Sequence, residues 1–112
     1  MALSPNIPPG SLHMLILKSL ARLGSMHGYG IALFLEQMSE GVLDVEEGSL
    51  YPALQRLLLK GWVRAEWKQT ENNRRARYYT LTADGKKALV EEMAAFDRVN
   101  RAITLIIHPT EA

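Results

Sequence analysis

Apolar residues recur at steps of three and four in two early stretches of the chain, the spacing of one helix face. The first stretch begins after Ser11, a residue type that caps helices, and stops at Gly24. The second follows a connector over residues 25–28 and stops near Gly41. The apolar positions are Leu12, Leu15, Ile16, Leu20 and Leu23, then Ile31, Phe34, Leu35 and Met38. The pattern predicts two amphipathic helices.

A third helix is predicted over residues 49–60, after a loop over residues 42–48. Pro52 then falls in the first turn, where a missing amide hydrogen costs nothing because that donor has no intrahelical partner. Gly61 supplies the left-handed stop. The apolar stripe is Leu50, Leu54, Leu57 and Leu58. The other faces carry Ser49, Tyr51, Gln55 and Arg56.

Two strands are predicted next, over residues 62–69 and 77–81, because both segments are rich in aromatic and β-branched residues. The polar turn between them contains Asn72 and Asn73, which tolerate turn geometry well. The order predicts a short amphipathic helix that runs directly into a β-hairpin. One interpretation of Trp62, Trp67, Tyr78 and Tyr79 is stacking on the bases of a single-stranded nucleic acid. Core packing is favoured instead, because strand residues alternate faces, which would bury some of them against the helices, and isolated hairpins are marginally stable.

The last predicted helix is long, because no Gly or Pro interrupts residues 86–108. Thr82 can cap it, and Asp84 in its first turn complements the helix dipole. Its apolar face is too long for so small a domain to cover, so a second copy of the chain is the expected partner. The predicted homodimer interface comprises Leu89, Met93, Phe96, Val99, Asn100, Ile103 and Ile106.

Composition allows one domain of 112 residues with an ordinary apolar content of 47%. The net charge of +1 disfavours a uniformly basic nucleic-acid binder. Charge is uneven, however, because residues 61–80 carry five basic and two acidic side chains, whereas residues 1–60 and residues 81–112 each carry four basic and five acidic ones. Any affinity for DNA therefore has to come from the hairpin and its neighbouring helix.

A helix that fits the major groove beside a basic hairpin separates base contacts from backbone contacts, which favours binding to double-stranded DNA. The candidate DNA-binding residues are Ser49, Tyr51, Gln55 and Arg56 on the helix and Lys68, Arg74, Arg75 and Arg77 on the hairpin. Each has a simpler interpretation as a solvated surface side chain, and Tyr51 could instead pack on the preceding helix. Strand residues alternate faces, so some hairpin cations must point away from the duplex.

Other classes of protein find little support. The chain has no cysteine, and His13, His27 and His108 are scattered singly, so we expect no enzyme, metal site or cofactor. No basic leader precedes an apolar run, and no segment approaches the roughly 18 apolar residues of a membrane span. We therefore expect a cytoplasmic location without membrane contact. A winged adaptor that binds proteins and not DNA stays the alternative.

Four ordered motifs resemble the PadR family of bacterial transcriptional regulators: HGYGIA, EEGSLYPALQRL, GWVRAEW and NNRRARYYTLTADGKKAL. The resemblance implies a winged helix-turn-helix fold, mainly α with a small two-stranded β wing, and a homodimer joined through the C-terminal helix. It also implies repression of nearby genes, relieved by a small molecule. The two-fold axis of a dimer would in turn require a pseudo-palindromic operator. The expected division is an N-terminal arm (1–10), a DNA-binding domain (11–81) and a dimerisation helix (82–112).

The single C-terminal helix resembles the short subfamily, whose multidrug-sensing members stack a tryptophan of this helix on planar drugs. Phe96 stands at the matching position, so the resemblance implies a hydrophobic or aromatic inducer near Phe96, Met93 and Met14. Phenylalanine attracts cations less strongly than an indole does. The competing interpretation of these side chains is simple packing between two protomers.

Overall fold

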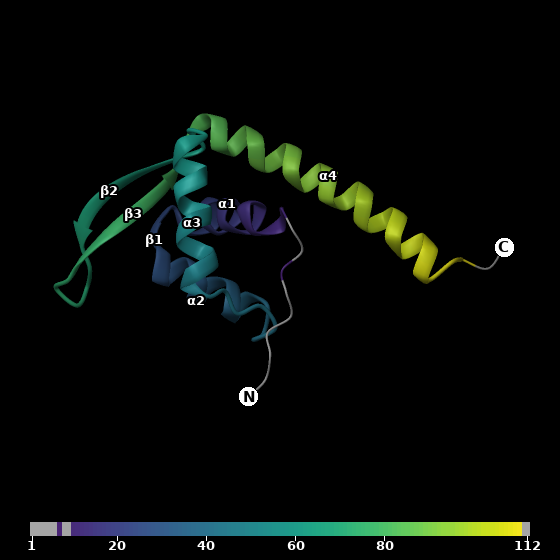
Figure 1. Ribbon diagram of the computed structural model, residues 1–112, viewed down its shortest axis with the longest axis horizontal. Coiled ribbons are helices and arrows are strands. Elements are labelled where there is room, and N and C mark those ends of the chain that lie inside the picture. The colour runs from purple at the N-terminus through teal and green to yellow at the C-terminus, as the bar shows by residue number, and fades with distance from the viewer. Residues whose placement is uncertain (1–6, 8–9, 111–112) are drawn as a thin grey trace.

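The computed structural model describes residue 7 and residues 10–110 (Figure 1). Within them the chain forms four helices and three strands. The elements are α1 Ser11–Leu23, β1 Ser25–His27, α2 Gly28–Met38, α3 Glu47–Leu59, β2 Val63–Gln69, β3 Arg75–Leu81 and α4 Ala83–Ile107. The arm predicted for residues 1–10 lies outside the described residues apart from Ile7 and Gly10. The predicted class, mainly α with a small sheet, is confirmed.

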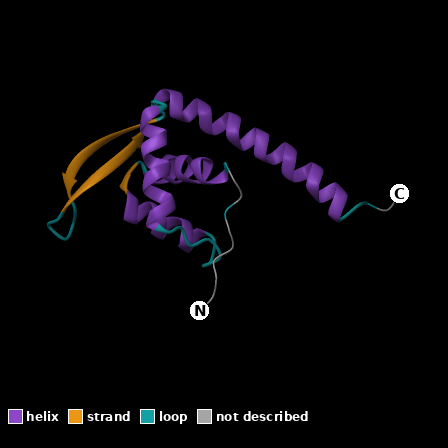
Figure 2. Cartoon of the chain, viewed as in Figure 1, coloured by secondary structure: helices purple, strands orange, loops and turns teal. Residues whose placement is uncertain are grey.

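The sheet is antiparallel, with strand order β1-β3-β2, so it has three strands where the sequence predicted two. The additional strand β1 occupies the connector between α1 and α2, and its Met26 pairs with Tyr79 of β3. Three residues show no alternating pattern, so this strand forms because β3 offers it an open edge to pair with. Beyond β1, strands β2 and β3 continue alone as a twisted hairpin, called the wing here (Figure 2).

The residues that cap the helix N-termini agree only in part with those predicted from the sequence. Ser11 does not cap α1, because Gly10 with φ of 85° holds the N-cap position without a side-chain hydrogen bond. Thr82 does cap α4: its hydroxyl accepts from the Gly85 amide over 3.0 Å. At α2 the cap is His27, whose Nδ1 accepts from the Gly30 amide over 3.0 Å. A helix-capping role is therefore filled by a side chain outside the usual Ser, Thr, Asn and Asp set.

Helix α3 begins two residues earlier than predicted, with Glu46 as its N-cap. The amides of Ser49 and Leu50 both donate to the Glu46 carbonyl, over 3.0 and 2.9 Å. Pro52 thus lies in the second turn, not the first, and cannot return a hydrogen bond to the carbonyl four residues before it. The predicted stop is confirmed, since Gly61 has φ of 76° and Trp62 donates to the Leu57 carbonyl.

The core lies where α1 meets α2, α3 and the sheet. It consists of apolar side chains at helical spacing, and the most deeply buried are Ile16, Leu17, Leu20, Ile31, Leu50, Leu54 and Leu57. The sheet contributes Val63, Tyr79 and Leu81 from one face. The start of α4 closes this core through Ala88 and Leu89, because Gly85 lets the helix approach the Trp62 carbonyl with no room for a Cβ.

Beyond Met93, α4 leaves the domain and projects from it (Figure 1), which gives the molecule principal extents of 59 × 38 × 21 Å. Leu89 is buried in the protomer's own core, so it is not available to a partner, although the sequence placed it in the dimer interface. Met93 packs against that core and keeps part of its surface exposed. Within residues 10–110, no helix is both long and apolar enough to cross a bilayer.

Candidate nucleic-acid interface

Helix α3 presents a polar outer face. Ser49, Gln55 and Arg56 are exposed, while the apolar stripe opposite them is buried against α1 and α2. Gln55 lies close to the centre of this outer face, because the buried Ala53 and Leu57 are each two positions away and therefore about 160° round the helix from it. An amide side chain on an exposed helix face can hydrogen-bond the edge of an adenine in the major groove.

Tyr51 lies between α2 and the wing, so its side chain both packs within the domain and remains partly exposed. Its ring covers the backbone of Gly28, where an added Cβ would come within 2.9 Å of the ring carbon Cε1. The sequence allowed this packing role as one of two interpretations. The side chain is still 44% exposed, so it also keeps a surface for a partner.

A hollow of about 420 Å³ lies between the wing, Tyr51 of α3 and the start of α2. Tyr51 lines it from α3, and Arg75 and Arg77 line it from β3. Three of the predicted DNA-binding residues, from two elements, are thus brought around one concave surface. Phenolic and guanidinium groups donate hydrogen bonds to phosphate oxygens, so the hollow suits a segment of sugar-phosphate backbone.

The register of the wing decides which cations face this hollow. Trp67 pairs with Arg77 and Gln69 with Arg75, which places these four side chains on the face that carries the core further up the sheet. Lys68 pairs with Ala76 on the opposite face. There its ammonium lies 3.4 Å from the Glu66 carboxylate and 5.4 Å from the Tyr78 ring centroid. Lys68 is therefore separated from Arg75 and Arg77.

The tip of the wing is a short, hydrogen-bonded turn. The Thr70 amide donates to the Arg74 carbonyl over 2.6 Å, and the Asn73 amide donates to the Thr70 carbonyl over 3.0 Å. Asn73 has φ of 63°, the left-handed conformation that asparagine tolerates, as the sequence predicted. Arg74 is exposed beside it. The turn thus places Arg74 at the end of the wing, directly before β3.

Arg56 lies apart from the hollow, in the last turn of α3. Its Nε donates to Nε2 of His13 on α1 over 3.3 Å. Burial lowers the pKa of His13, and the charges of Lys60 and Arg56 lower it further, while Glu92 opposes them. A neutral imidazole can accept this hydrogen bond, so the structure assigns Arg56 a contact within the protomer.

The start of α3 carries negative charge. Glu46 and Glu47 stand at its N-terminus, and with Asp44 and Glu36 they line a second hollow between α2 and α3. These carboxylates repel a phosphate from the helix N-terminus, and the Ser49 amide is already bonded to Glu46. For both reasons the start of α3 disfavours a phosphate contact at Ser49, one of the predicted DNA-binding residues. The backbone of a duplex is better accommodated on the wing side.

Two exposed aromatic side chains at this surface were not among the predicted DNA-binding residues. Trp67 is 58% exposed and Tyr29 is 69% exposed, and both line the hollow beside Tyr51. Burial of some of the four aromatic residues Trp62, Trp67, Tyr78 and Tyr79 was expected, and it holds for Tyr79. Trp67 lies on the same face of β2 as the buried Val63, but four residues further along the strand. This distance along the strand from the core was the signal in the sequence that could have indicated an exposed Trp67.

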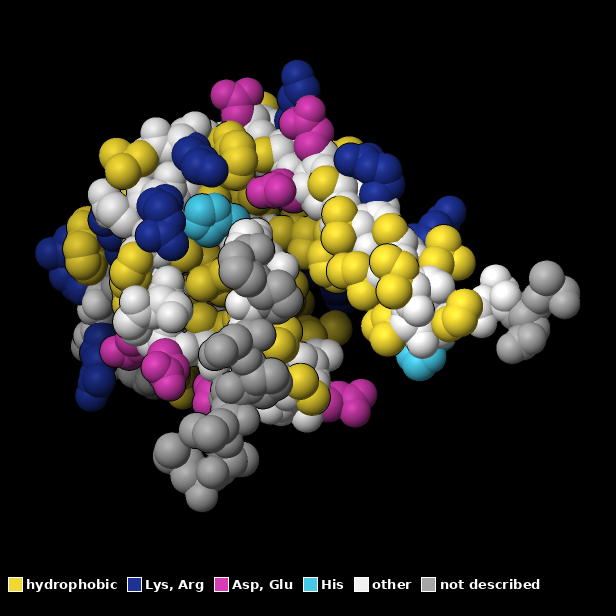
Figure 3. Space-filling view, turned by 45° about the vertical axis from the view of Figure 1, so that its right-hand side comes forward, with side chains coloured by type: hydrophobic (Ala, Val, Ile, Leu, Met, Phe, Trp, Pro, Cys, Tyr) yellow, Lys and Arg dark blue, Asp and Glu magenta, His cyan; other side chains and the backbone are white. Residues whose placement is uncertain are grey.

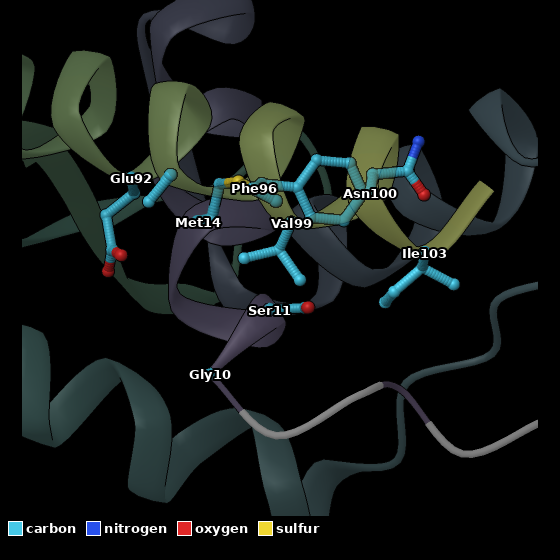
Figure 4. Close-up of a pocket in the computed structure, with 9 residues that line it drawn as sticks. Gly10, Ser11, Met14, Glu92, Phe96, Val99, Asn100 and Ile103 are labelled. Atoms are coloured by element: carbon cyan, nitrogen blue, oxygen red, sulfur yellow. The ribbon is translucent and has the colours of Figure 1, made fainter. Parts of the chain in front are cut away.

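A separate groove of about 400 Å³ runs between the start of α1 and the projecting part of α4. Its walls include Met14 from α1 and Phe96, Val99 and Ile103 from α4 (Figure 4). Two of the three residues predicted near an inducer, Met14 and Phe96, therefore face the same space. Met93 is half-buried against the core and is not part of these walls.

Comparisons with known proteins support this architecture. The model of the Transcriptional regulator PadR-like family matches residues 16–91. A PadR family transcription regulator from Clostridium difficile is 26% identical, with a TM-score of 0.72 over 88% of this chain and 99% of that one. A PadR-like transcription factor from Bacteroides fragilis is 28% identical, with a TM-score of 0.66 over 87% and 90%. No curated protein sequence matches significantly.

Bacillus subtilis PadR, whose structure was solved in complex with operator DNA, is 25% identical with a TM-score of 0.66. The match covers 78% of this chain and 48% of that protein, so the present chain corresponds to about half of that relative. The family model covers more than half of this chain, over the core, the wing and the start of α4. The chain therefore belongs to the PadR-like family of transcriptional regulators.

Proposed function

We propose that this regulator is a homodimeric repressor, acting in the cytoplasm, that binds a pseudo-palindromic operator through α3 and the wing. The observation that supports it most strongly is the hollow in which Tyr51, Arg75 and Arg77 meet. Base contacts then belong to Gln55 on the outer face of α3, and backbone contacts to Arg74, Arg75 and Arg77. The operator complex of the Bacillus subtilis relative agrees with a duplex as the partner.

Dimerisation is proposed to occur through α4, so that residues 82–112 form a dimerisation helix and residues 11–81 the DNA-binding part. The support is an exposed apolar stripe on the projecting half of the helix (Figure 3). Its members are Phe96, Val99, Ile103 and Ile106, with exposed fractions of 44, 58, 49 and 80%. A second copy covers such a stripe in water, because burial of apolar area is favourable.

Release from DNA is proposed to follow binding of a small hydrophobic or aromatic molecule in the groove between α1 and α4. Met14 and Phe96 line this groove. Its α4 wall also includes Val99 and Ile103, which with Phe96 belong to the proposed dimer stripe, so the inducer would bind beside the second protomer. The inducer has to bind one arrangement of the dimer more tightly than the DNA-competent one, since equal affinity for both shifts nothing. Packing of a second protomer into the groove would remove the space and refute this part.

The test is titration of a duplex from the promoter of the chain's own gene at low ionic strength, followed by electrophoretic mobility. We expect one shifted species containing two protomers. Arg75→Ala should weaken it, and Lys68→Ala, which changes the opposite face of the wing, should do so less. A chain that stays monomeric and ignores every duplex would refute the proposal and favour the adaptor function.

A further inference from the structure

Trp67 supports a charged side chain that the proposed function uses. The guanidinium carbon Cζ of Arg75 lies 5.4 Å from the centroid of the Trp67 ring. Arg75 pairs with Gln69, two residues along β2, so it is the diagonal neighbour of Trp67 on the same face of the wing. Diagonal neighbours on an antiparallel ribbon are within reach when one is aromatic and the other is long.

The tryptophan is placed for a role other than core packing. It remains 58% exposed, whereas Tyr79 on the same face is 4% exposed and belongs to the core. Trp67 lines the hollow with Tyr51, and Arg75 stands at the same wall. Exposure of so large an aromatic surface to water is unfavourable, and the part of the ring that faces Arg75 is covered by a cation–π contact with the guanidinium.

We propose that Trp67 is a positioning residue for DNA binding: its ring holds the Arg75 guanidinium toward the hollow before a phosphate arrives. This inference rests on the proposed function. An arginine near a hairpin tip has many rotamers, and ordering them on binding lowers affinity. Stacking on Trp67 restricts the rotamers in the free protein, so less is lost when the duplex binds.

Arg74 provides a matched comparison within the same hairpin. Among the residues that the structure describes, it lies over no aromatic ring, whereas its neighbour Arg75 does. Both carry one positive charge and both lie at the end of the wing. Trp67 should therefore be coupled energetically to Arg75 and not to Arg74.

The experiment is a double-mutant cycle on operator affinity, with Trp67→Ala combined with Arg75→Ala or with Arg74→Ala. We expect Trp67→Ala to weaken binding about two- to five-fold for each wing, the range of an exposed cation–π contact. The factor should disappear in the Arg75→Ala background and persist in the Arg74→Ala background. Equal factors in all three backgrounds would overturn the inference.

Two further readouts separate positioning from a general structural role. Trp67→Phe keeps a ring under the guanidinium and should restore most of the affinity. Trp67→Ala should leave the dependence of affinity on salt unchanged, because no charge is lost, whereas Arg75→Ala should flatten it. No rescue by phenylalanine would overturn the inference. If the wild-type protein binds no duplex, the proposed function itself fails, and this inference fails with it.

Discussion

The Nε of Arg56 on α3 donates a hydrogen bond to Nε2 of His13 on α1, over 3.3 Å. This bond connects the C-terminal turn of the helix proposed to contact bases with the helix that forms one wall of the α1–α4 groove. Met14, the next residue on α1, lines that groove, and so does Glu92 of α4. His13 is thus placed between the two proposed sites.

Acid should destabilise the protein through His13. Burial, Lys60 and Arg56 lower its pKa in the folded state, against a smaller opposing effect of Glu92, so folding favours the neutral imidazole. The contribution to stability is therefore fully present above the unfolded pKa of about 6.5 and is lost as the pH falls below it. Urea unfolding at several pH values and one protein concentration should show this loss.

The control for that titration is His13→Gln, which keeps a hydrogen-bond acceptor but does not titrate. We expect its free energy of unfolding to depend less on pH between 7.5 and 5.5 than that of the wild type. If both proteins lose the same stability over this interval, His13 is not the group responsible.

Removing the two arginines at the end of the wing should flatten the salt dependence of DNA binding. Arg74→Ala/Arg75→Ala removes guanidinium groups proposed to contact phosphates, and each lost contact lowers the log-log slope by about 0.9. Fluorescence anisotropy with a labelled duplex over a range of salt concentrations measures this slope. Lys86→Ala/Lys87→Ala makes the same change in charge at the start of α4, away from the turn, and its slope should stay near that of the wild type.

Gln55→Ala should change which bases are preferred more than it changes affinity for DNA in general. The side chain is exposed on the outer face of α3, where it can contact a base edge. A good contact of this kind discriminates between bases by about 1–3 kcal/mol. Binding to a library of operator variants is the measurement, and an equal loss over all sequences would make Gln55 a backbone contact.

Charge placed on the apolar stripe of α4 should separate the protomers. Ile103→Glu puts a carboxylate in the proposed interface, so sedimentation should show monomers at concentrations where the wild type is dimeric. Leu105→Glu is the matched control: its exposed fraction of 55% resembles the 49% of Ile103, but it lies on another face of the same helix. Equal behaviour of the two variants would argue against an interface along this stripe.

A methyl group at Gly85 should destabilise the domain strongly. A Cβ there would overlap the Trp62 carbonyl, which belongs to the backbone and cannot move aside. We expect Gly85→Ala to cost about 1–3 kcal/mol, the usual range for overpacking. Gly48→Ala in α3 meets nothing within 4 Å and should be neutral or slightly stabilising. Thermal unfolding of both variants tests the contrast.

The sequence predicted all four helices and the two long strands, because each has a clear period or a strong stop such as Gly61. It missed β1, since three residues carry no alternation and pair only once β3 is in place. It placed the start of α3 too late, because Ser49 and Pro52 are typical of a first turn and Glu46 is not a strong cap.

The candidate interface was predicted as a set of residue types but not as a geometry. The structure brings Arg75, Arg77 and Tyr51 around one hollow. Lys68 instead lies on the other face of the wing, and Arg56 donates a hydrogen bond to His13. Strand register and long-range packing decide these placements, and neither can be obtained from local periodicity.

The most direct test of the central proposal is hydroxyl-radical footprinting of the operator complex. Two copies of α3 in successive major grooves should protect two half-sites about 34 Å apart, related by the symmetry of a dimer. Protection of a single isolated half-site by one protomer would contradict the account.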